Sequence, residues 1–414
     1  MAERVLVVGG GVIGIACAVF LQRAGCRVTL LERDTVGGGA SRGNCGLLYG
    51  SDLVPLCHPG AVAHGLRLLL AGGSPLVVRP SLDPARLAWF VRFARHCRPA
   101  RLAPAMRARA RLLSSAVALY TEAFARGELF AAEPPAGVLL VFEGEEGLRA
   151  YRETNRLLAP WGCAAEEVPA ARLAEIEPAL RPGAAGGFWH RADRHLRPER
   201  LMDSWKQAAL RAGVELREGA TAFGFRREGD RIAAVLADAG EFAADQVVLA
   251  AGAWTAPLTR KAGIRLPIQP GKGYSRTHPL SGRPPAVPCY FYERRVVVTP
   301  FADGVRLGGT MEFAGFDLSL DPDRLEALAH AAAAGLLEPP AAAPCECWAG
   351  LRPMSPDDLP LIGRAPGGSN LWVASGHGML GLTAAPATGR LLAELVTGRR
   401  PHIDPRPFSP RRFR

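Results

Sequence analysis

Near its start, the sequence places a glycine-rich turn between a short apolar strand and a helix, and this restricts the fold more than any other feature. Arg4–Val8 is typical of a buried parallel strand, because it is an apolar run that glycine ends. Gly9–Gly14 matches the pattern G-x-G-x-x-G and opens a helical pattern. A second strand, Arg27–Leu31, ends at Glu32. This order of elements predicts a βαβ unit that binds a dinucleotide.

Each part of this unit has a chemical reason. The glycines allow a tight turn and let a pyrophosphate approach the helix N-terminus, where free N–H groups and the helix dipole favour anions. Glu32 can accept hydrogen bonds from a ribose diol and would repel a 2′-phosphate. The expected contacts to the ADP part are Gly9, Gly11, Val12, Ile13, Gly14, Glu32 and Arg33. The unit alone does not separate NAD from FAD.

The next segment helps with that choice. Residues 37–46 are rich in glycine and small polar residues, which suits an extended backbone running along a cofactor. An NAD-dependent dehydrogenase would normally continue with its next strand and helix here, so the segment favours FAD. We expect Ser41, Asn44, Gly46 and Leu47 to line the cofactor.

Two later segments return to the nucleotide-binding unit. Residues 245–252 and 370–375 are short apolar strands, and the second runs into a glycine loop and a helix that continues to Val396 and stops at Gly398. A helix dipole aimed at the isoalloxazine would stabilise the anionic reduced flavin. The expected contacts are Ala251, Gly252, Trp254, Gly376, His377, Gly378, Met379, Leu380, Gly381, Leu382 and Thr383.

The segments between these strands predict a second domain. The expected fold class is α/β, with a Rossmann-like FAD-binding domain on a parallel sheet and a discontinuous α+β substrate domain on an antiparallel sheet. The expected division is 1–52, 193–262 and 348–398 for FAD, 53–192 and 263–347 for substrate, and 399–414 as an extended basic surface tail. Predicted helices are Leu82–His96, Ala105–Ala125, Glu145–Leu158 and Pro322–Gly335, and predicted strands are Gly137–Phe142, Tyr290–Tyr292, Val296–Pro300 and Val305–Gly309.

Charge and cysteine content narrow the setting. The formal net charge is +11, but only three of the 50 basic residues are lysines, which indicates compositional bias and no nucleic-acid partner. Seven arginines between residues 92 and 111 form a run without an acid, predicting either a solvated helix face or docking to anionic lipid. They are Arg92, Arg95, Arg98, Arg101, Arg107, Arg109 and Arg111.

The nine cysteines show no CxxC pair, so neither a disulfide framework nor a metal site follows. Cys345 and Cys347 are expected to be two buried thiols. A reduced, cytoplasmic setting is expected, with possible peripheral contact to a membrane. No stretch approaches the ~20 apolar residues of a membrane span.

With these segments placed, the chain resembles the D-amino-acid oxidase superfamily of FAD-dependent amine oxidoreductases. Within it, the sequence is similar to bacterial D-amino-acid dehydrogenases and to glycine oxidase and hydroxyproline dehydrogenase relatives. The resemblance covers nearly the whole chain. It rests on Gly9–Glu32, Ser41–Gly46, Asp245–Trp254, Lys272–Ser275, Gly350–Asp357 and Gly376–Gly389.

The resemblance implies roles for individual residues. Arg352 would bind the substrate carboxylate beside the flavin, or it would instead form a structural salt bridge to Asp357 or Asp358. The loop from His377 to Thr383 would line the flavin ring. Sarcosine oxidase relatives tether FAD through a cysteine just before the segment matching Met354–Asp357, whereas the nearest thiol here, Cys347, lies upstream, so noncovalent FAD is expected. Tyr274, Tyr290 and Tyr292 are candidate walls of the substrate pocket, or half-buried packing residues of strands. His58 is a candidate contact to the flavin or substrate, or a structural residue.

The implied reaction is oxidative deamination of a D-amino or D-imino acid. Hydride passes from Cα to flavin N5, the imino acid hydrolyses to a 2-oxo acid and ammonia, and the electrons go to a quinone-type acceptor. The first alternative is an oxidase of glycine, sarcosine or a cyclic imino acid that uses oxygen and makes hydrogen peroxide. An alternative of another class is a basic-surface binding protein with a structural flavin. The sequence does not predict the oligomeric state.

Overall fold

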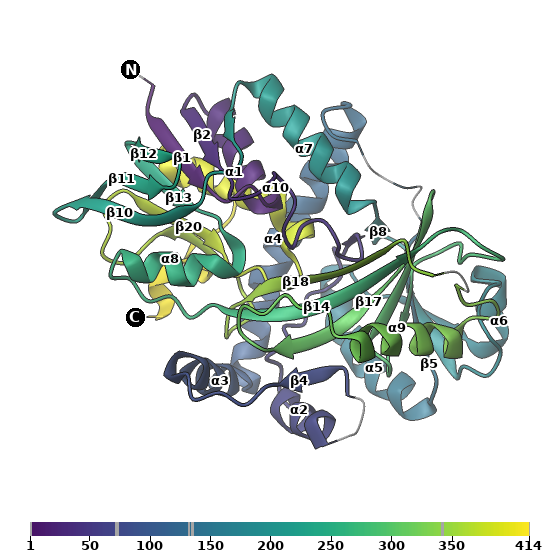
Figure 1. The fold of residues 1–414 in the computed structure, drawn as a ribbon. Helices are drawn as coiled ribbons and strands as arrows, with labels where there is room; N and C mark the ends of the chain where they lie inside the picture. Colours follow the sequence, from purple (N-terminus) through teal and green to yellow (C-terminus); the bar gives the residue numbers. More distant parts are fainter. Residues whose placement is uncertain (1, 71–73, 131–132, 134–135, 341–342, 414) are drawn as a thin grey trace.

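Two sheets of different kinds organise the chain (Figure 1). The structure is a computed structural model that describes residues 2–70, 74–130, 133, 136–340 and 343–413. Both ends of the described chain lie on the side of the smaller sheet. The arrangement confirms the predicted α/β fold with one parallel and one antiparallel sheet.

The smaller sheet has six strands in the order β19-β20-β13-β1-β2-β9. All neighbouring pairs are parallel except β19 with β20. The strands are β1 (Arg4–Val8), β2 (Arg27–Leu31), β9 (Glu215–Arg217), β13 (Gln246–Leu249), β19 (Leu361–Arg364) and β20 (Leu371–Ser375). The helices packed with it are α1 (Val12–Arg23), α7 (Pro198–Ala212) and α10 (Gly381–Val396).

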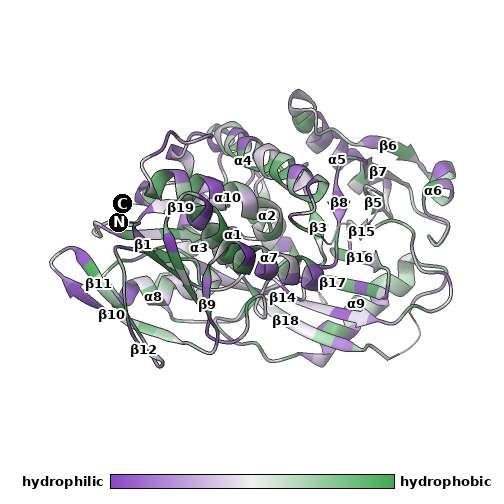
Figure 2. Cartoon of the chain, turned by 90° about the horizontal axis from the view of Figure 1, so that it is seen from above, coloured by the Kyte–Doolittle hydropathy of each residue, from purple (hydrophilic) through white to green (hydrophobic). Residues whose placement is uncertain are grey.

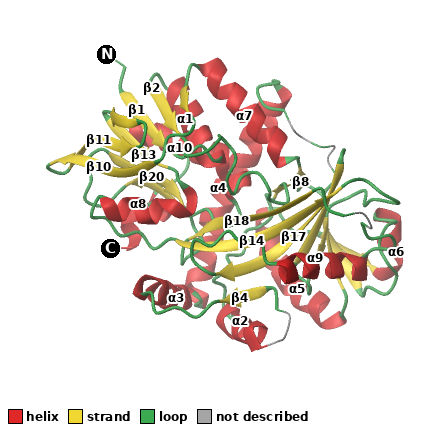
Figure 3. Ribbon diagram, viewed as in Figure 1, coloured by secondary structure: helices red, strands yellow, loops and turns green. Residues whose placement is uncertain are grey.

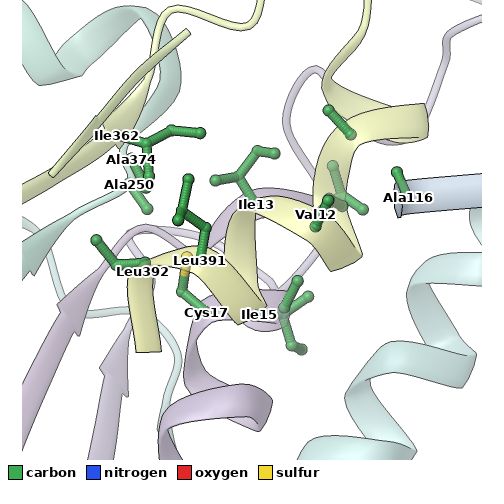
Figure 4. Packing of buried hydrophobic residues seen from close by; sticks show 14 of the residues in the cluster. Val12, Ile13, Ile15, Cys17, Ala116, Ala250, Ile362, Ala374, Leu391 and Leu392 are labelled. Carbon is green, nitrogen blue, oxygen red and sulfur yellow. The ribbon is translucent and has the colours of Figure 1, made fainter. Parts of the chain in front are cut away.

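The core beneath this sheet brings α1 and α10 into close contact (Figure 4). A Cβ at Gly14 would lie 1.8 Å from the Gly9 carbonyl oxygen, and one at Gly389 would lie 2.7 Å from the Ala16 carbonyl oxygen. Both positions therefore require glycine. Helix α4 (Pro99–Ala125) adds Ala116 to the same core.

The larger sheet has nine strands, in the order β18-β14-β17-β16-β15-β5-β7-β6 with β4 paired to β17. Most of its pairs are antiparallel, and α9 (Pro322–Gly335) lies across one face (Figure 3). The predicted boundary between residues 347 and 348 falls inside β18. The strands are β4 (Leu76–Val78), β5 (Val138–Phe142), β6 (Glu166–Pro169), β7 (Gly186–His190), β14 (Gln269–His278), β15 (Cys289–Phe291), β16 (Val296–Phe301), β17 (Gly304–Phe313) and β18 (Glu346–Met354).

Smaller elements surround the two sheets. A three-stranded sheet projects at one end of the molecule (Figure 2), and β3 pairs with β8 between the larger units. These strands are β3 (Leu47–Leu48), β8 (Arg194–His195), β10 (Ala222–Glu228), β11 (Arg231–Ala237) and β12 (Gly240–Ala243). The other helices are α2 (Ala61–Leu70), α3 (Pro84–His96), α5 (Glu145–Leu158), α6 (Ala170–Ile176) and α8 (Thr255–Lys261).

The element predictions are confirmed where the pattern is local. Helices α5 and α9 have the predicted bounds, but α4 begins six residues before the predicted Ala105, because Pro99 occupies its first position and the helix continues through Pro104. The strands β14 and β18 are not predicted by the sequence analysis. Both contain proline and glycine, which lower strand propensity.

Two predictions about surface groups are corrected. Arg109 is 3% exposed and ion-paired, whereas the other six arginines of the run are exposed. Cys345 is exposed and Cys347 half-buried, so these are not two buried thiols.

The tail is not simply an extended surface segment. Phe408 is buried, and Arg412 donates to Asp357 at 2.7 Å, because short helical turns fold the tail back against β19. Residue 414 lies outside the described part. Across the described residues, we find no helix that is both long and apolar enough to span a membrane.

Candidate active site

A cavity of about 1840 Å³ lies at the carboxyl ends of the parallel strands. Its lining includes Val8 of β1, Leu31 at the end of β2 and Ser375 of β20. This edge is where open α/β sheets bind their ligands. The volume exceeds the roughly 300–1,000 Å³ of a site for one drug-sized molecule. The cavity therefore has room for a dinucleotide together with a substrate.

One end of the cavity has the chemistry of a dinucleotide site. Gly9 has φ +108°, and a Cβ there would lie 2.6 Å from the Ala250 carbonyl oxygen. Glu32 accepts hydrogen bonds from the backbone N–H groups of Gly10 (2.6 Å) and Asp34 (3.0 Å), which fixes the carboxylate at the turn. Gly11 is the N-cap residue of helix α1, which has no side-chain cap and no acid in its first turn. An uncapped helix N-terminus beside a fixed carboxylate fits a pyrophosphate and a ribose.

Most predicted contacts to the ADP part line this end. Ser41 Oγ accepts from the Val12 N–H at 2.9 Å, and Arg33 lies 4.5 Å over the Trp254 ring. Asn44 stabilises the turn in which it lies. Its side-chain Nδ2 donates to the Ser41 carbonyl oxygen, and its Oδ1 accepts from the Gly46 N–H. The predicted residues that line the cavity are Gly9, Gly11, Val12, Ile13, Glu32, Arg33, Ser41, Asn44, Gly46, Leu47, Ala251, Gly252 and Trp254. Gly14 is a packing position and is not part of the lining.

The loop before α10 lines the middle of the cavity. His377, Gly378, Met379, Leu380, Gly381, Leu382 and Thr383 all contribute to the lining, whereas Gly376 does not. His377 is buried, and burial lowers its pKa to about 3, so the imidazole is neutral at pH 7. Its Nε2 bonds Thr388 Oγ1 at 2.9 Å, and its Nδ1 has no partner among the described residues. The free nitrogen and the uncapped start of α10 fit the polar edge of a flavin.

Arg352 projects from β18 into the far end of the cavity. Its Nη1 donates to the Thr310 carbonyl oxygen at 2.9 Å, and Thr310 has the rare φ of +65°. A Cβ at Gly273, on the neighbouring strand β14, would lie 2.3 Å from this Nη1. Glycine therefore makes room for the guanidinium at this position.

Arg352 forms no ion pair with a carboxylate of the described residues. Asp357 instead pairs with Arg412 at 2.7 Å, and Asp358 pairs with Arg109 at 2.6 Å. The alternative of a structural salt bridge from Arg352 to Asp357 or Asp358 is therefore excluded. Burial lowers the pKa of the Arg352 guanidinium. Arginine nevertheless stays protonated in proteins, so the group keeps its charge.

The three candidate tyrosines differ in whether they line the cavity. Tyr290 and Tyr292 line the cavity, as do His58 and Met354. Tyr274 does not, and its predicted role as a pocket wall is wrong. Successive side chains of a strand point to opposite faces, so Gly273 faces Arg352 while Tyr274 packs in the core with α9 and donates to Glu312 at 2.6 Å.

The sequence analysis missed several lining residues, above all Arg295. Arg295 lies in the turn after β15 with φ +56° and places its guanidinium 4.3 Å over the Tyr292 ring. Tyr49, Tyr151 and His64 also line the cavity. No local motif marks these residues, because each comes from a different element and the chain has many arginines.

Comparisons with known proteins show what the whole chain is similar to. The sequence model of a family described as FAD dependent oxidoreductase matches residues 4–395. A D-amino acid dehydrogenase of Xanthobacter autotrophicus is 36% identical over 99% of both chains. D-amino acid dehydrogenase 2 of Mesorhizobium japonicum is 34% identical over 97% of this chain and 98% of that one.

Solved structures show a similar fold. A glycine oxidase from Geobacillus kaustophilus has a TM-score of 0.77 at 25% identity, covering 99% of this chain and 98% of that one. An L-proline dehydrogenase from P. horikoshii has a TM-score of 0.75 at 20% identity, covering 100% and 98%. At the lower identity the likeness shows the fold alone.

Proposed function

Because the chain belongs to the family of FAD-dependent oxidoreductases, we propose that it oxidises D-amino acids to imino acids, which hydrolyse to 2-oxo acids and ammonia. FAD, when bound, supplies the acceptor for the hydride that leaves Cα of the substrate. The observation that carries the proposal is the guanidinium of Arg352, which lines the cavity without a carboxylate partner among the described residues. The proposal also draws on the relatives named D-amino acid dehydrogenase.

Arg352 binds the α-carboxylate in this proposal. A guanidinium offers a planar pair of N–H donors that match the two oxygens of a carboxylate. The Thr310 carbonyl and the space above Gly273 hold the group in one orientation. A carboxylate held in this way fixes Cα relative to the cofactor, so that the energy of binding is used for orientation.

The neighbouring side chains act as neutral groups. Burial raises the pKa of Tyr290, so its phenol stays protonated and can donate a hydrogen bond to the substrate. His377 stays neutral at neutral pH, so one of its two ring nitrogens carries a proton and the ring positions the cofactor loop. Apolar lining such as Met354, Leu351 and Leu380 keeps water away from the reacting atoms.

The electrons pass to a quinone-type acceptor at an anionic membrane surface in this proposal. Helix α2 has no buried residue, and Leu66, Leu70 and Leu87 of α2 and α3 are more than half exposed. Exposed arginines without carboxylate partners among the described residues, such as Arg92 and Arg95, follow on α3. Apolar side chains beside cationic ones are the pattern that anionic lipid surfaces attract.

Anaerobic mixing of the FAD-bound protein with amino acids tests the reaction. We expect D-amino acids to bleach the yellow flavin absorbance and L-amino acids to leave it. We also expect slow reoxidation in air and fast reoxidation by a quinone analogue. Fast reoxidation in air with hydrogen peroxide would favour the oxidase alternative, and an unbleached flavin with every amine would contradict the proposal.

The membrane part has its own test. The protein is mixed with vesicles of phosphatidylglycerol or of phosphatidylcholine alone and floated through a density gradient. We expect the parent protein to float with the anionic vesicles only. The double variant Leu66→Glu/Leu70→Glu should not float with either kind of vesicle. Absence of flotation with both would contradict this part and leave the reaction unaffected.

A further inference from the structure

A second guanidinium faces the substrate end of the cavity. Arg295 lies over the Tyr292 ring, donates from Nη1 to the Tyr290 hydroxyl at 3.4 Å, and approaches His64 Nε2 with Nη2 at 3.4 Å. Because arginine can only donate, His64 accepts through Nε2 and is neutral in this contact. Burial and the neighbouring Arg295 both lower the pKa of His64, which agrees with a neutral ring.

Neither this guanidinium nor Arg352 is neutralised by the protein. Among the described residues no carboxylate forms an ion pair with either. Five carboxylates line the cavity: Glu32, Asp34, Asp52, Glu146 and Glu293. Asp34 pairs with Arg33 at 2.9 Å, and Glu146 is exposed and forms no ion pair with either guanidinium. The other three have the following partners. Glu32 accepts from the backbone at the dinucleotide end, Asp52 pairs with Arg109 at 3.2 Å, and Glu293 accepts from the Glu143 N–H at 3.2 Å.

The two guanidiniums belong to one region. Val296 pairs with Gly309 across β16 and β17, and a Cβ at Gly309 would lie 2.7 Å from the Arg295 carbonyl oxygen. Arg295 therefore lies beside Gly309, and the carbonyl of the next residue, Thr310, accepts from Arg352. A substrate with one carboxylate would leave one of two partly desolvated cations without an anion. A partly buried charge without a partner is unfavourable, and a second anionic group would remove that cost.

We propose that Arg295 selects substrates with a second carboxylate, so that the chain acts on D-amino acids with an acidic side chain. This inference rests on the proposed function, and it assigns Arg352 to the α-carboxylate and Arg295 to the side-chain carboxylate. The turn that carries Arg295 favours such a role. Its φ of +56° is strained for an arginine, and the stacking on Tyr292 holds the guanidinium toward the cavity.

The test compares D-glutamate with D-glutamine, which have nearly the same shape and differ in side-chain charge. We expect the parent protein to reduce its flavin with a kcat/KM for D-glutamate at least tenfold above that for D-glutamine. Arg295→Gln should lower this ratio by about 10- to 100-fold, the range of a charge-assisted hydrogen bond. Arg295→Lys keeps the charge and should retain part of the ratio.

Arg294→Gln is the matched control. Arg294 is the adjacent residue in the same turn, is exposed, and pairs with Glu143 outside the cavity lining. Its substitution should leave the ratio as in the parent. A parent that prefers D-glutamine, or a ratio that is unchanged in Arg295→Gln, would overturn the inference. An equal loss for both substrates, which leaves the ratio unchanged, would mean that both arginines hold the α-carboxylate.

A binding measurement separates this inference from the proposed reaction. Glutarate and its monoamide are titrated into the oxidised FAD-bound protein, and the change in flavin absorbance gives each Kd. We expect glutarate to bind more tightly, with the difference lost in Arg295→Gln and kept in Arg294→Gln. Equal Kd values in the parent would overturn the anion site. If no D-amino acid reduces the flavin while glutarate still binds preferentially, the proposed reaction fails and the second anion site stands.

Discussion

Arg109 and Arg352 are two buried guanidiniums with opposite surroundings. Arg109 of α4 pairs with Asp358 at 2.6 Å and Asp52 at 3.2 Å, and it also donates to the Asp52 carbonyl oxygen. Arg352 of β18 donates to one backbone carbonyl and otherwise faces the cavity. The first cation is neutralised by the fold, and the second is left for a ligand.

The difference shows what separates a structural from a ligand-binding charge. Burial lowers the pKa of Arg109, but Asp52 and Asp358 outweigh burial and raise it, whereas burial dominates for Arg352 and lowers its pKa. A buried pair that loses one partner leaves a costly unpaired charge. A charge that the fold leaves unpaired costs stability, and a site can retain it because the ligand supplies the partner.

The largest expected effect is on stability. Arg109→Met leaves Asp358 buried without its partner, so the free energy of unfolding of the FAD-bound protein should fall by about 3–5 kcal/mol. Urea denaturation measures it. Arg107→Met on the same helix is the control, because Arg107 is exposed, and it should stay within roughly 0.5 kcal/mol of the parent. A small effect of Arg109→Met would remove the contrast between the two arginines.

Arg352→Met should give the reverse result. Without the guanidinium, the α-carboxylate of a D-amino acid loses its partner, so the transition state should lose about 2–5 kcal/mol of stabilisation and kcat/KM should fall accordingly. The free energy of unfolding should stay level or rise. Stopped-flow flavin reduction and urea denaturation measure the two quantities. Arg352→Lys keeps the charge without the fork and should recover only part of the activity. A strong loss of stability in Arg352→Met would contradict the assignment.

A smaller loss is expected when Arg352 is only displaced. Gly273→Ala adds a Cβ that would lie 2.3 Å from Arg352 Nη1, so the guanidinium must shift. A misplacement of ~1 Å can lower a rate by on the order of 100-fold, so kcat/KM should fall by up to about 100-fold. Gly224→Ala is the control, because its Cβ would meet Leu236 only at 3.6 Å, outside the cavity lining. Equal activity of both variants would show that Arg352 does not depend on this contact.

The smallest expected effect is on the pH dependence of stability, through the neutral imidazole of His377 in the same cavity. The pKa of His377 is about 3 in the folded protein and ~6.5 when unfolded, so the unfolded chain binds more protons between these values. The stability from a neutral His377 is therefore complete well above pH ~6.5 and lost as the pH falls through and below that value, by about 1.4 kcal/mol at pH 5.5. Unfolding from pH 7.5 to 5 should show a shallower acid loss in His377→Gln than in the parent. If stability falls with pH equally steeply in both proteins, folding does not lower the pKa of His377.

Sequence reasoning succeeded where the chemistry is contiguous. The spacing from Gly9 to Glu32 is local, so strand, turn, helix and acid could be predicted together, and they line the cavity as one unit. Arg352 was singled out by the resemblance of its segment to a family motif, and it lines the same cavity, while its role stays a prediction. The alternation of β14 could not be placed, because three of the five residues before Tyr274 in that strand are glycine or proline. Tyr274 was therefore named as a candidate pocket wall, with packing as the alternative, and the structure shows packing.

Other residues needed the tertiary structure. Arg109 belongs to a run that is otherwise exposed, and it becomes structural because Asp52 and Asp358, the latter 249 positions away, approach it. Arg295 is one of many arginines, and its position in the cavity depends on the turn after β15 and on the pairing of β15 with β16. Sequence alone shows neither which charges meet nor which are left unpaired.

The most direct test of the central claim is the preference for a carboxylate in the parent protein and in Arg352→Met. Stopped-flow flavin reduction is measured anaerobically with D-alanine and with D-alaninamide, which lacks the carboxylate. If Arg352 is the unpaired cation that binds this group, the parent prefers D-alanine strongly and Arg352→Met reduces the preference to near unity. If both substrates lose rate equally in Arg352→Met, or neither does, Arg352 does not bind the substrate carboxylate.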